Sequence, residues 1–309
     1  MFANLFKGGD ELAVEKMFAR FSVNEKKKYG QGGYGATYAA LDVEKQEELA
    51  VKVIDTRRMK PEAIMKECRI LETLDHTNVI SVKAHGPGMR KKNQHHLYFI
   101  FMELASGGEL FDQVIDRGTN AMTEEVAKGF IRQLLAGVAH CHSKLIAHRD
   151  LKLENVLLTS SGVVKIIDFG LSHVYSAAED GTADRSKALT DMCGSKSYAA
   201  PEVLSGAGYD GFAADVWSIG VSLFAMLSGF FPLDEASAKD WRFPKLCEAQ
   251  DRRRSTTRVV YSWYRRSASH LSDSVIMLLD HMLAIDPAKR ATMAQALAYV
   301  DDGAAAPRA

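Results

Sequence analysis

The chain has 309 residues, of which 47% are hydrophobic and 25% are charged, and its 39 Lys and Arg balance its 39 Asp and Glu. This composition is typical of a globular protein. A formal net charge of zero excludes a global electrostatic attraction to nucleic acid or to an anionic membrane, so any recognition by charge must be local. The four cysteines are scattered without metal-ligand spacing, which favours reduced thiols over a disulfide framework.

The N-terminal residues have neither a long apolar run nor a small-residue cleavage site. We therefore expect no signal or transmembrane segment, and a protein of the cytoplasm or nucleus. Residues 10–21 follow, and their apolar residues fall on one face of a predicted helix. Such faces usually join a core, so we favour packing against the domain that follows over a docking element for a partner.

Residues 30–37 read GQGGYGAT, in which Gly30, Gly32 and Gly35 fit G-x-G-x-x-G. Glycine lets a turn bring backbone N–H groups close to phosphates, although a plain hairpin turn has the same pattern. A dinucleotide-binding loop would need a helix directly after the glycines and an acid about 20 residues later. Here Thr37 leads instead into a short strand, a charged loop and a second strand, LAVKVI, so a β-hairpin is favoured.

Lys52 lies inside that second apolar strand, where a phosphate ligand explains it better than a surface lysine does. Residues 61–74 predict a helix that begins at a proline and carries Glu67 at its middle. Residues 89–96 form a basic stretch without an aromatic platform, so a solvated loop is favoured over a nucleic-acid-binding patch. The apolar run at residues 97–102 predicts a buried strand.

Residues 123–145 predict an amphipathic helix with Thr123 as its N-cap. His140 and His142 in this helix are two residues apart, which is wrong for binding one metal together, so we expect structural roles. The stretch HRDLKLEN follows at residues 148–155, and a β-like run then ends in DFG at residues 168–170.

H-R-D-L-x-x-x-N and D-F-G are the patterns of the catalytic loop and the metal-binding turn of protein kinases. Both are present in that order, and A-P-E follows at residues 200–202. Over residues 21–300 the sequence therefore resembles a eukaryotic Ser/Thr protein kinase. The residues around Cys193 are most similar to the calcium/calmodulin-dependent, AMP-activated and checkpoint kinase group.

The resemblance implies an α+β, bilobal protein-kinase-like fold with a small β-rich lobe, one key helix in that lobe, and a larger, mainly helical lobe. The expected boundaries are an N-terminal extension over residues 1–20, the small lobe over 21–103, the large lobe over 104–300 and a disordered tail over 301–309. Residues 233–272 match the family poorly, and a solvated loop or helix is expected there.

The resemblance also implies catalytic roles. Asp150 accepts the proton of the attacking hydroxyl, Lys152 stabilises the transferring phosphoryl oxygens, and Asn155 and Asp168 supply oxygen ligands for Mg²⁺. Lys52 is expected to pair with Glu67. The residues implied for ATP binding are Gly30, Gly32, Gly35, Thr37, Ala50, Lys52, Glu67, Glu103, Ala105, Glu109, Leu157 and Asp168. Among these, Thr37 stands where the family usually has valine.

Several further residues have expected roles in bracing, substrate choice and regulation. Asp215 resembles the buried aspartate that braces the catalytic loop, and Glu202 is expected to pair with Arg290. Glu109 and Glu154 match positions that meet an arginine three residues before the phosphoacceptor. The expected regulatory residues are Arg149, Asp191 and Thr190, in an activation segment with a polar, mobile insertion near residues 176–187. Ser255, Thr256 and Thr257 each follow an arginine by three residues, in a segment interpreted as exposed. This pattern leaves two alternatives open, self-phosphorylation at one of these residues and plain surface charge.

The sequence thus predicts transfer of the γ-phosphate of ATP, with Mg²⁺, to Ser or Thr of protein substrates that carry basic residues nearby. We expect neither nucleic acid nor membrane as a partner. Two alternatives stay open. A pseudokinase scaffold is disfavoured because Lys52, Asp150, Asn155 and Asp168 are all present, and a phosphotransferase for small molecules is disfavoured by the complete A-P-E segment.

Overall fold

The structure is a computed structural model that describes residues 10–89, 94, 96–115 and 122–302. The chain divides into two compact units, Met1–Ser106 and Gly107–Ala309, just beyond the lobe boundary expected after residue 103. Most of the basic loop, most of the predicted tail and the start of the N-terminal extension lie outside the described residues. Helix α10 (Met293–Asp302) runs into the first positions of that tail.

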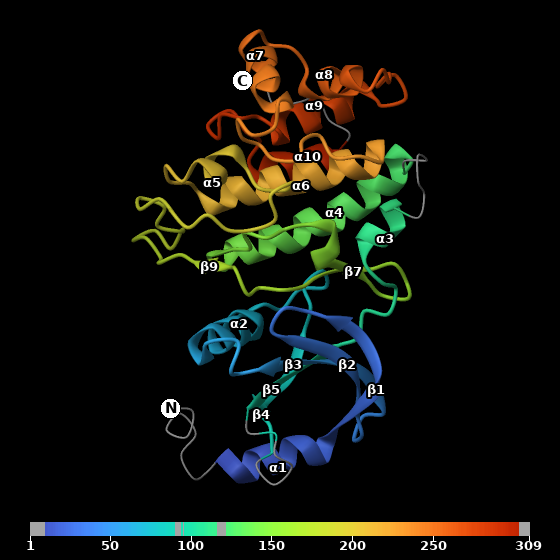
Figure 1. Ribbon diagram of the computed structural model, residues 1–309, viewed down its shortest axis with the longest axis vertical. Helices are drawn as coiled ribbons and strands as arrows, with labels where there is room; N and C mark the ends of the chain where they lie inside the picture. The colour runs from blue at the N-terminus through green and yellow to red at the C-terminus, as the bar shows by residue number, and fades with distance from the viewer. Residues whose placement is uncertain (1–9, 90–93, 95, 116–121, 303–309) are drawn as a thin grey trace. The chain divides into compact units, whose positions relative to one another are not determined.

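The first unit contains a five-stranded antiparallel sheet with the strand order β1-β2-β3-β5-β4, shown in Figure 1. Val51 and Phe101 face each other across the central strands and are fully buried, because the apolar runs of these strands are covered on both sides. The buried strand predicted at residues 97–102 is therefore confirmed. The strands are β1 (Phe21–Gln31), β2 (Gly35–Asp42), β3 (Glu47–Asp55), β4 (Val82–Pro87) and β5 (Leu97–Glu103).

Helix α1 (Asp10–Arg20) packs against this sheet. The ring of Phe18 meets Phe99 edge-on with 4.9 Å between the ring centroids, and Met17 joins the same apolar cluster. Arg20 pairs with the buried carboxylate of Asp42 at 2.7 Å. These contacts confirm the prediction that the N-terminal helix joins a core.

Helix α2 (Pro61–Thr73) begins at the predicted proline. Proline suits the first turn of a helix because its missing N–H would have no partner there. Ile64 and Cys68 turn toward the sheet and pack in one cluster with Tyr98 and Ile100. Glu67, on the same face, is only 2% exposed, so the helix carries an acid into the apolar side of the unit.

The second unit is mainly helical, and helix α4 packs against α6 and α10 (Figure 1). Thr123 caps α4 as predicted, with its Oγ1 accepting the N–H of Val126 at 3.4 Å. Two short antiparallel sheets, β6 with β9 and β7 with β8, carry the segments before and after the catalytic-loop sequence. The larger elements are α3 (Leu110–Ile115), α4 (Glu124–Ser143), α5 (Pro201–Ser205), α6 (Gly211–Ser228), α7 (Arg242–Asp251), α8 (Thr256–Trp263), α9 (Asp273–Met282) and α10; the shorter ones are β6 (Ile146–Ala147), the 3₁₀ turn η3 (Leu153–Asn155), β7 (Val156–Leu158), β8 (Val164–Ile166) and β9 (His173–Val174).

Helix α6 is the core of this unit. Within the described parts of the chain it alone is long and apolar enough to cross a membrane, but 89% of it is buried in the protein. Asp210 caps its N-terminus by accepting the N–H of Phe212 at 2.9 Å, and Gly229 ends it in the left-handed conformation. Its polar residue Asp215 is buried at 1% exposure and therefore requires partners.

Candidate active site

In the first unit, the ammonium group of Lys52 contacts the carboxylate of Glu67. Lys52 Nζ lies 2.6 Å from Glu67 Oε1, so strand β3 and helix α2 are joined by an ion pair. The second oxygen, Glu67 Oε2, is buried without a hydrogen-bond partner in the described structure. A buried carboxylate oxygen that lacks a donor is costly, so this site retains capacity for one further polar contact.

The glycine-rich sequence forms the predicted β-hairpin and not a strand–helix turn, because β2 follows β1 directly. The N–H of Gly32 donates to the carbonyl oxygen of Gly35 at 2.8 Å and closes the turn. A Cβ at Gly35 would lie 1.9 Å from the carbonyl oxygen of Val53, so only glycine fits this close approach. Farther along, Thr37 pairs with Lys52 across β2 and β3, which sets the lysine in register with the hairpin.

The other implied ATP residues of this unit lie near the ends of β3 and β5. Ala50 is buried in β3 opposite Met102. Glu103 ends β5, where its carboxylate accepts the N–H of Ser81 at 2.8 Å, and Ala105 follows it half-buried. The side chain of Glu103 is thus engaged within the unit.

In the second unit, Asp215 of helix α6 fixes the backbone of the catalytic loop. Its carboxylate accepts the N–H groups of His148 at 2.9 Å and Arg149 at 2.8 Å, and His142 contacts it at 2.9 Å. Arg149 adopts a φ of 66°, a left-handed conformation that costs energy for a residue with a side chain. The buried carboxylate compensates for this strain, as the predicted bracing role requires.

The carboxylate of Asp150 is held by contacts on both oxygens. Oδ1 accepts the backbone N–H of Ser195 at 2.9 Å and its hydroxyl at 3.0 Å. Oδ2 accepts the side-chain amide of Asn155 at 3.1 Å and lies 3.2 Å from Lys152 Nζ. Lys152 also donates to the hydroxyl of Ser195 at 3.0 Å. The three predicted catalytic residues are therefore brought together, with Ser195 as a fourth member.

The D-F-G turn begins at Asp168, whose φ of 63° is left-handed. Its Oδ1 accepts the N–H of Gly170 at 3.4 Å, while Phe169 is 1% exposed and meets the ring of His148 edge-on at 4.8 Å. His148 in turn contacts the carbonyl oxygen of Ile167 at 3.0 Å. The buried phenylalanine thus anchors the turn to the catalytic loop.

Asn155 and Asp168 supply the chemistry that Mg²⁺ prefers, since both carry oxygen donors. Asn155 uses its Nδ2 toward Asp150, at the backbone and side-chain oxygens, which turns its amide in a defined direction. The described residues contain no group of three or more His, Cys, Asp or Glu side chains placed to hold a metal. A metal at Asn155 and Asp168 would therefore depend on additional oxygens from a phosphate ligand.

Three acidic side chains lie near the start of α3. Glu109 forms an isolated bridge with Leu157, and burial raises its pKa, with further contributions from the charges of Asp112 and Glu154. Tyr198 donates its hydroxyl to Glu154 at 3.0 Å, which orients that carboxylate. Carboxylates that repel one another and are partly buried form a site that favours a cation.

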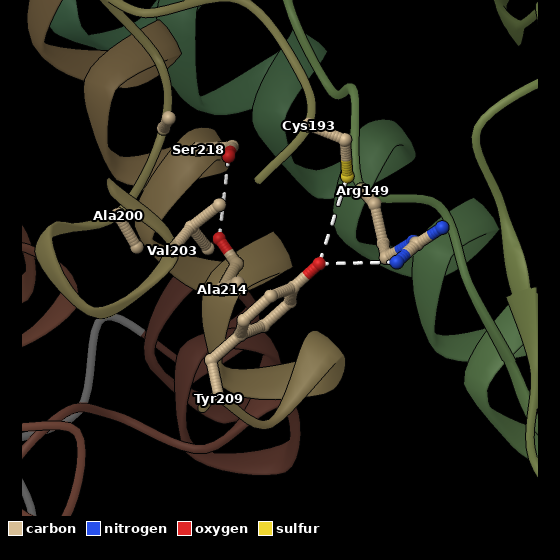
Figure 2. Close-up of a pocket in the computed structure, with 8 residues that line it drawn as sticks. Arg149, Cys193, Ala200, Val203, Tyr209, Ala214 and Ser218 are labelled. Atoms are coloured by element: carbon tan, nitrogen blue, oxygen red, sulfur yellow. Dashed lines mark hydrogen bonds between the residues drawn. The ribbon is translucent and has the colours of Figure 1, made fainter. Parts of the chain in front are cut away.

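The activation segment is tied to the catalytic loop through Arg149. Figure 2 shows the hydroxyl of Tyr209 between Arg149 and Cys193, with 3.1 Å to Arg149 Nη1 and 3.6 Å to the Cys193 sulfur. Tyr209 also donates to the backbone oxygen of Asp191 at 2.9 Å. The side chain of Asp191 reaches Arg149 only at 3.5 Å and is 77% exposed, so the ion pair between these two expected regulatory residues is present but weak.

Comparison with known families gives a match over most of the chain, in which the family described as protein kinase domain covers residues 23–300. The chain belongs to the protein kinase family. The predicted α+β kinase fold is thereby confirmed.

Curated relatives of this kinase domain include two proteins of Arabidopsis thaliana. CBL-interacting serine/threonine-protein kinase 1 is 40% identical over 210 residues, which are 67% of this chain and 44% of the relative. CBL-interacting serine/threonine-protein kinase 9 is 36% identical over 226 residues, 72% of this chain and 47% of the relative. CBL-interacting protein kinase 9 of Oryza sativa subsp. japonica is 37% identical, over 68% of this chain and 44% of its own length. The chain spans less than half the length of these relatives.

Residues 255–257 of the kinase domain were interpreted from the sequence as exposed, and the structure shows a different arrangement. Thr256 and Thr257 are 2% and 0% exposed. Thr257 donates its hydroxyl to Asp280 of α9 at 2.8 Å, and Thr256 accepts from Gln250 at 2.7 Å. Ser255 is half-buried and caps α8 by accepting the N–H of Arg258. The interpretation of this segment as exposed is therefore wrong for both threonines.

The insertion near residues 176–187 of the activation segment forms a small hairpin-like turn. Ala178 donates its N–H to the carbonyl oxygen of Thr182 at 2.8 Å, and Asp184 donates to Ser176 at 2.8 Å. Arg185 extends from it to Asp210 at 2.8 Å. The carboxylate of Asp180 adds side-chain support by accepting the N–H of Thr182 at 2.9 Å and its hydroxyl at 2.7 Å, so the polar insertion forms a defined turn.

Two functional positions of the kinase domain were missed by reasoning from the sequence. Ser195 lies two residues after Cys193, in the stretch that carries the family resemblance, and it bonds the proposed catalytic aspartate, Asp150. Tyr209, which links Arg149 to the activation segment, carried no sequence signal at all. A signal for Ser195 was available, since a hydroxyl directly after Gly194 can reach an acid when the glycine adopts a positive φ, here 87°.

Proposed function

We propose that this chain is an ATP-dependent protein-serine/threonine kinase that transfers the γ-phosphate of Mg·ATP to protein hydroxyls. The observation that carries the proposal is the arrangement of Asp150, Lys152, Asn155 and Ser195. An acceptor carboxylate fixed on both oxygens can orient an attacking hydroxyl and take its proton. Of the properties named for the curated relatives, we assign only serine/threonine-protein kinase activity to this chain.

Different residues would stabilise the transferring phosphoryl group, bind the phosphates of ATP and hold Mg²⁺. In the second unit, Lys152 lies beside Asp150, where its positive charge can stabilise phosphoryl oxygens as negative charge develops on them. In the first unit, Lys52 is held in place by Glu67 and can bind phosphate, while the glycine-rich hairpin offers backbone N–H groups. Mg²⁺ held by Asn155 and Asp168 would neutralise phosphate charge.

The test is incubation of the purified chain with Mg²⁺, γ-labelled ATP and a basic peptide that contains one Ser, with a matched peptide in which that Ser is Ala. We expect label on the serine peptide only. A substrate panel that includes small alcohols separates protein phosphorylation from a small-molecule activity. Nucleotide-independent function with no transfer to any hydroxyl would instead indicate a scaffold.

We propose that Glu109 and Glu154 select an arginine three residues before the phosphoacceptor. Both carboxylates are positioned in the second unit, and Tyr198 orients Glu154. Replacing that arginine with Ala in a peptide should lower kcat/KM roughly tenfold, since a hydrogen bond to a charged group contributes about 1.5 kcal/mol. Glu154→Gln should remove most of this discrimination, measured on a peptide array.

The matched control for this prediction is Glu125→Gln, at an exposed acid of helix α4. It should leave the preference intact. Because burial raises the pKa of Glu109, this residue takes up a proton at higher pH than an ordinary glutamate. The preference for arginine should therefore weaken as the pH falls through that raised pKa and recover as the pH rises. Equal use of Arg and Ala peptides by the unmodified chain would contradict the assignment.

We propose that Asp191 gives partial activity before modification and that phosphate on Thr190 adds to it. Thr190 is exposed, and the guanidinium of Arg149 already contacts Asp191. An exposed ion pair contributes about 0–1 kcal/mol, so Asp191→Ala should lower basal activity by no more than about fivefold. A phosphate carries nearly two charges and three acceptor oxygens, so it should order the segment further.

The measurement compares dephosphorylated protein with protein phosphorylated at Thr190, each with and without Asp191→Ala. Thr190→Ala should remove only the increment. Asp184→Ala, in the same segment but bonded locally to Ser186, serves as the control and should change neither level. Unchanged basal activity in dephosphorylated Asp191→Ala would show that Asp191 is only a solvated loop residue.

A further inference from the structure

Helices α7 and α8 of the kinase domain place two tryptophans side by side at the surface. Trp241 precedes α7 and is 60% exposed, and Trp263 ends α8. Their ring centroids lie 5.9 Å apart. Tyr264 follows with 42% exposure. We call Trp241, Lys245, Trp263 and Tyr264 the tryptophan patch. Exposed clusters of this composition are characteristic of surfaces that bind partners, where Trp and Tyr contribute most of the affinity.

The charge around the tryptophan patch is positive. Lys245 Nζ lies 4.6 Å from the ring centroid of Trp241, and among the described residues neither Lys245 nor the adjacent Arg265 has an ion pair with an acid. Acids close in sequence to Lys245 have other partners, because Asp234 and Asp240 both pair with Arg242 at 2.7 Å and Glu248 pairs with Arg252 at 2.7 Å. Residues 233–272 contain nine Lys and Arg against five Asp and Glu, whereas the whole chain is neutral.

We propose that the tryptophan patch docks an acidic peptide segment of another protein, with an aromatic or branched aliphatic side chain between Asp and Glu residues. The apolar side chain would cover the tryptophan rings, and the flanking carboxylates would pair with Lys245 and Arg265. When the peptide covers the tryptophan rings, it also removes water from around the ammonium group of Lys245. The attraction of this group to the ring face of Trp241 and to a peptide carboxylate then becomes stronger.

The positive charge around the tryptophan patch disfavours two other occupants, a second copy of this chain and a nucleic acid. A second copy of this chain, docked patch to patch around a twofold axis, would bring Lys245 close to its own equivalent, and like charges oppose such an interface. A nucleic acid strand needs a basic groove that follows several phosphates. Among the described residues, only Lys245 in the patch and Arg265 next to Tyr264 in the sequence are available here as cations without an acidic partner. An acidic peptide with one apolar anchor matches both the number of cations and the size of the aromatic surface.

Tryptophan fluorescence reports on this surface directly. The chain has three tryptophans, and the third, Trp217, is only 1% exposed. The probe is a fluorescein-labelled twelve-residue peptide with Phe-Leu flanked by Asp and Glu, titrated by anisotropy, and its unlabelled form is titrated by tryptophan emission. We expect saturable binding by both readouts. Two further peptides serve as controls, one with Phe-Leu replaced by Gly-Ser and one with every acid replaced by Lys.

Trp241→Ala should weaken anisotropy-detected binding at least tenfold. Lys245→Glu, a surface change that keeps the fold, should weaken it similarly and improve binding of the lysine peptide. Arg253→Glu, at an exposed cation beyond the other end of α7, should have little effect. None of these measurements depends on catalysis, so their outcome is independent of the proposed kinase activity.

Three results would overturn the proposal. The first is absence of saturable binding up to millimolar peptide, or equal binding by Lys245→Glu. The second is equal affinity for the Gly-Ser peptide, which would reduce the surface to unspecific charge attraction. The third is a different occupant, detected as tighter binding of a single-stranded oligonucleotide or as concentration-dependent dimerisation that Trp241→Ala abolishes.

Discussion

Asp150→Asn is expected to lower turnover by about 10²–10⁴-fold, the usual contribution of a positioned proton acceptor. The replacement keeps an oxygen that can accept from Ser195 but removes the negative charge beside Lys152. The local structure should therefore persist while the proton acceptor is lost. Initial rates of ADP release with saturating peptide measure turnover, and nucleotide affinity measured by fluorescence should change little.

Asp168→Asn provides the contrast for this prediction. Asp168 lies in the D-F-G turn, where its carboxylate accepts the N–H of Gly170 at 3.4 Å. Its replacement should raise the Mg²⁺ concentration needed for half-maximal activity, because a carboxylate ligand becomes a neutral amide. If Asp150→Asn retained near-normal turnover, the assignment of the proton acceptor would be wrong whatever the behaviour of Asp168→Asn.

The second large effect concerns stability. Arg290 is 5% exposed, and its guanidinium contacts both carboxylate oxygens of Glu202, at 2.5 and 2.9 Å. It also donates to the carbonyl oxygens of Ala213 and Ala284. Removing one partner of a buried pair leaves a charge without compensation, so Arg290→Ala should lower the free energy of unfolding by about 3–5 kcal/mol. Chemical denaturation followed by circular dichroism measures the change.

Arg258→Ala is the matched control for the buried arginine. Arg258 pairs with Asp273 at 2.6 Å, but both side chains are more than half exposed. Water screens such a pair, so its loss should cost about 0–1 kcal/mol. In a double-mutant cycle with Glu202→Ala, the double variant should lose less free energy of unfolding than the sum of the losses in the two single variants. An Arg290→Ala protein as stable as the control would refute the structural role of the pair.

Much of the kinase domain could be predicted because the deciding signals are local. Pro61 and Thr123 mark helix starts through their own backbone and side-chain chemistry. Lys52 and Asp150 lie in short patterns whose spacing is fixed by one strand and one loop. The alternation and apolar runs of the strands likewise depend on neighbours in sequence, so the sheet of the first unit follows from them.

The residues whose surroundings were not predicted from the sequence have one feature in common. Their partners come from an element that is distant in the sequence. Thr257 is polar and follows three arginines, yet it is buried because Asp280 from α9 accepts its hydroxyl. The tryptophans at 241 and 263 become neighbours only when α7 and α8 pack together. Tyr209 acquires its role from Arg149, which precedes it by many residues. No local pattern contains these partners, so the sequence could not reveal them.

The carboxylate of Asp215 has a consequence for the kinetics of local opening. It belongs to a buried helix, and it holds the amide protons of His148 and Arg149. These amide protons can exchange with solvent only if helix α6 separates from the catalytic loop. We therefore expect the loop and the core helix to unfold together, as one cooperative unit. The carboxylate of Asp191, by contrast, is 77% exposed and reaches Arg149 only at 3.5 Å, so this ion pair can break without unfolding of the helix. The kinase domain can thus lose this contact of the activation segment at low energetic cost while the catalytic loop stays folded.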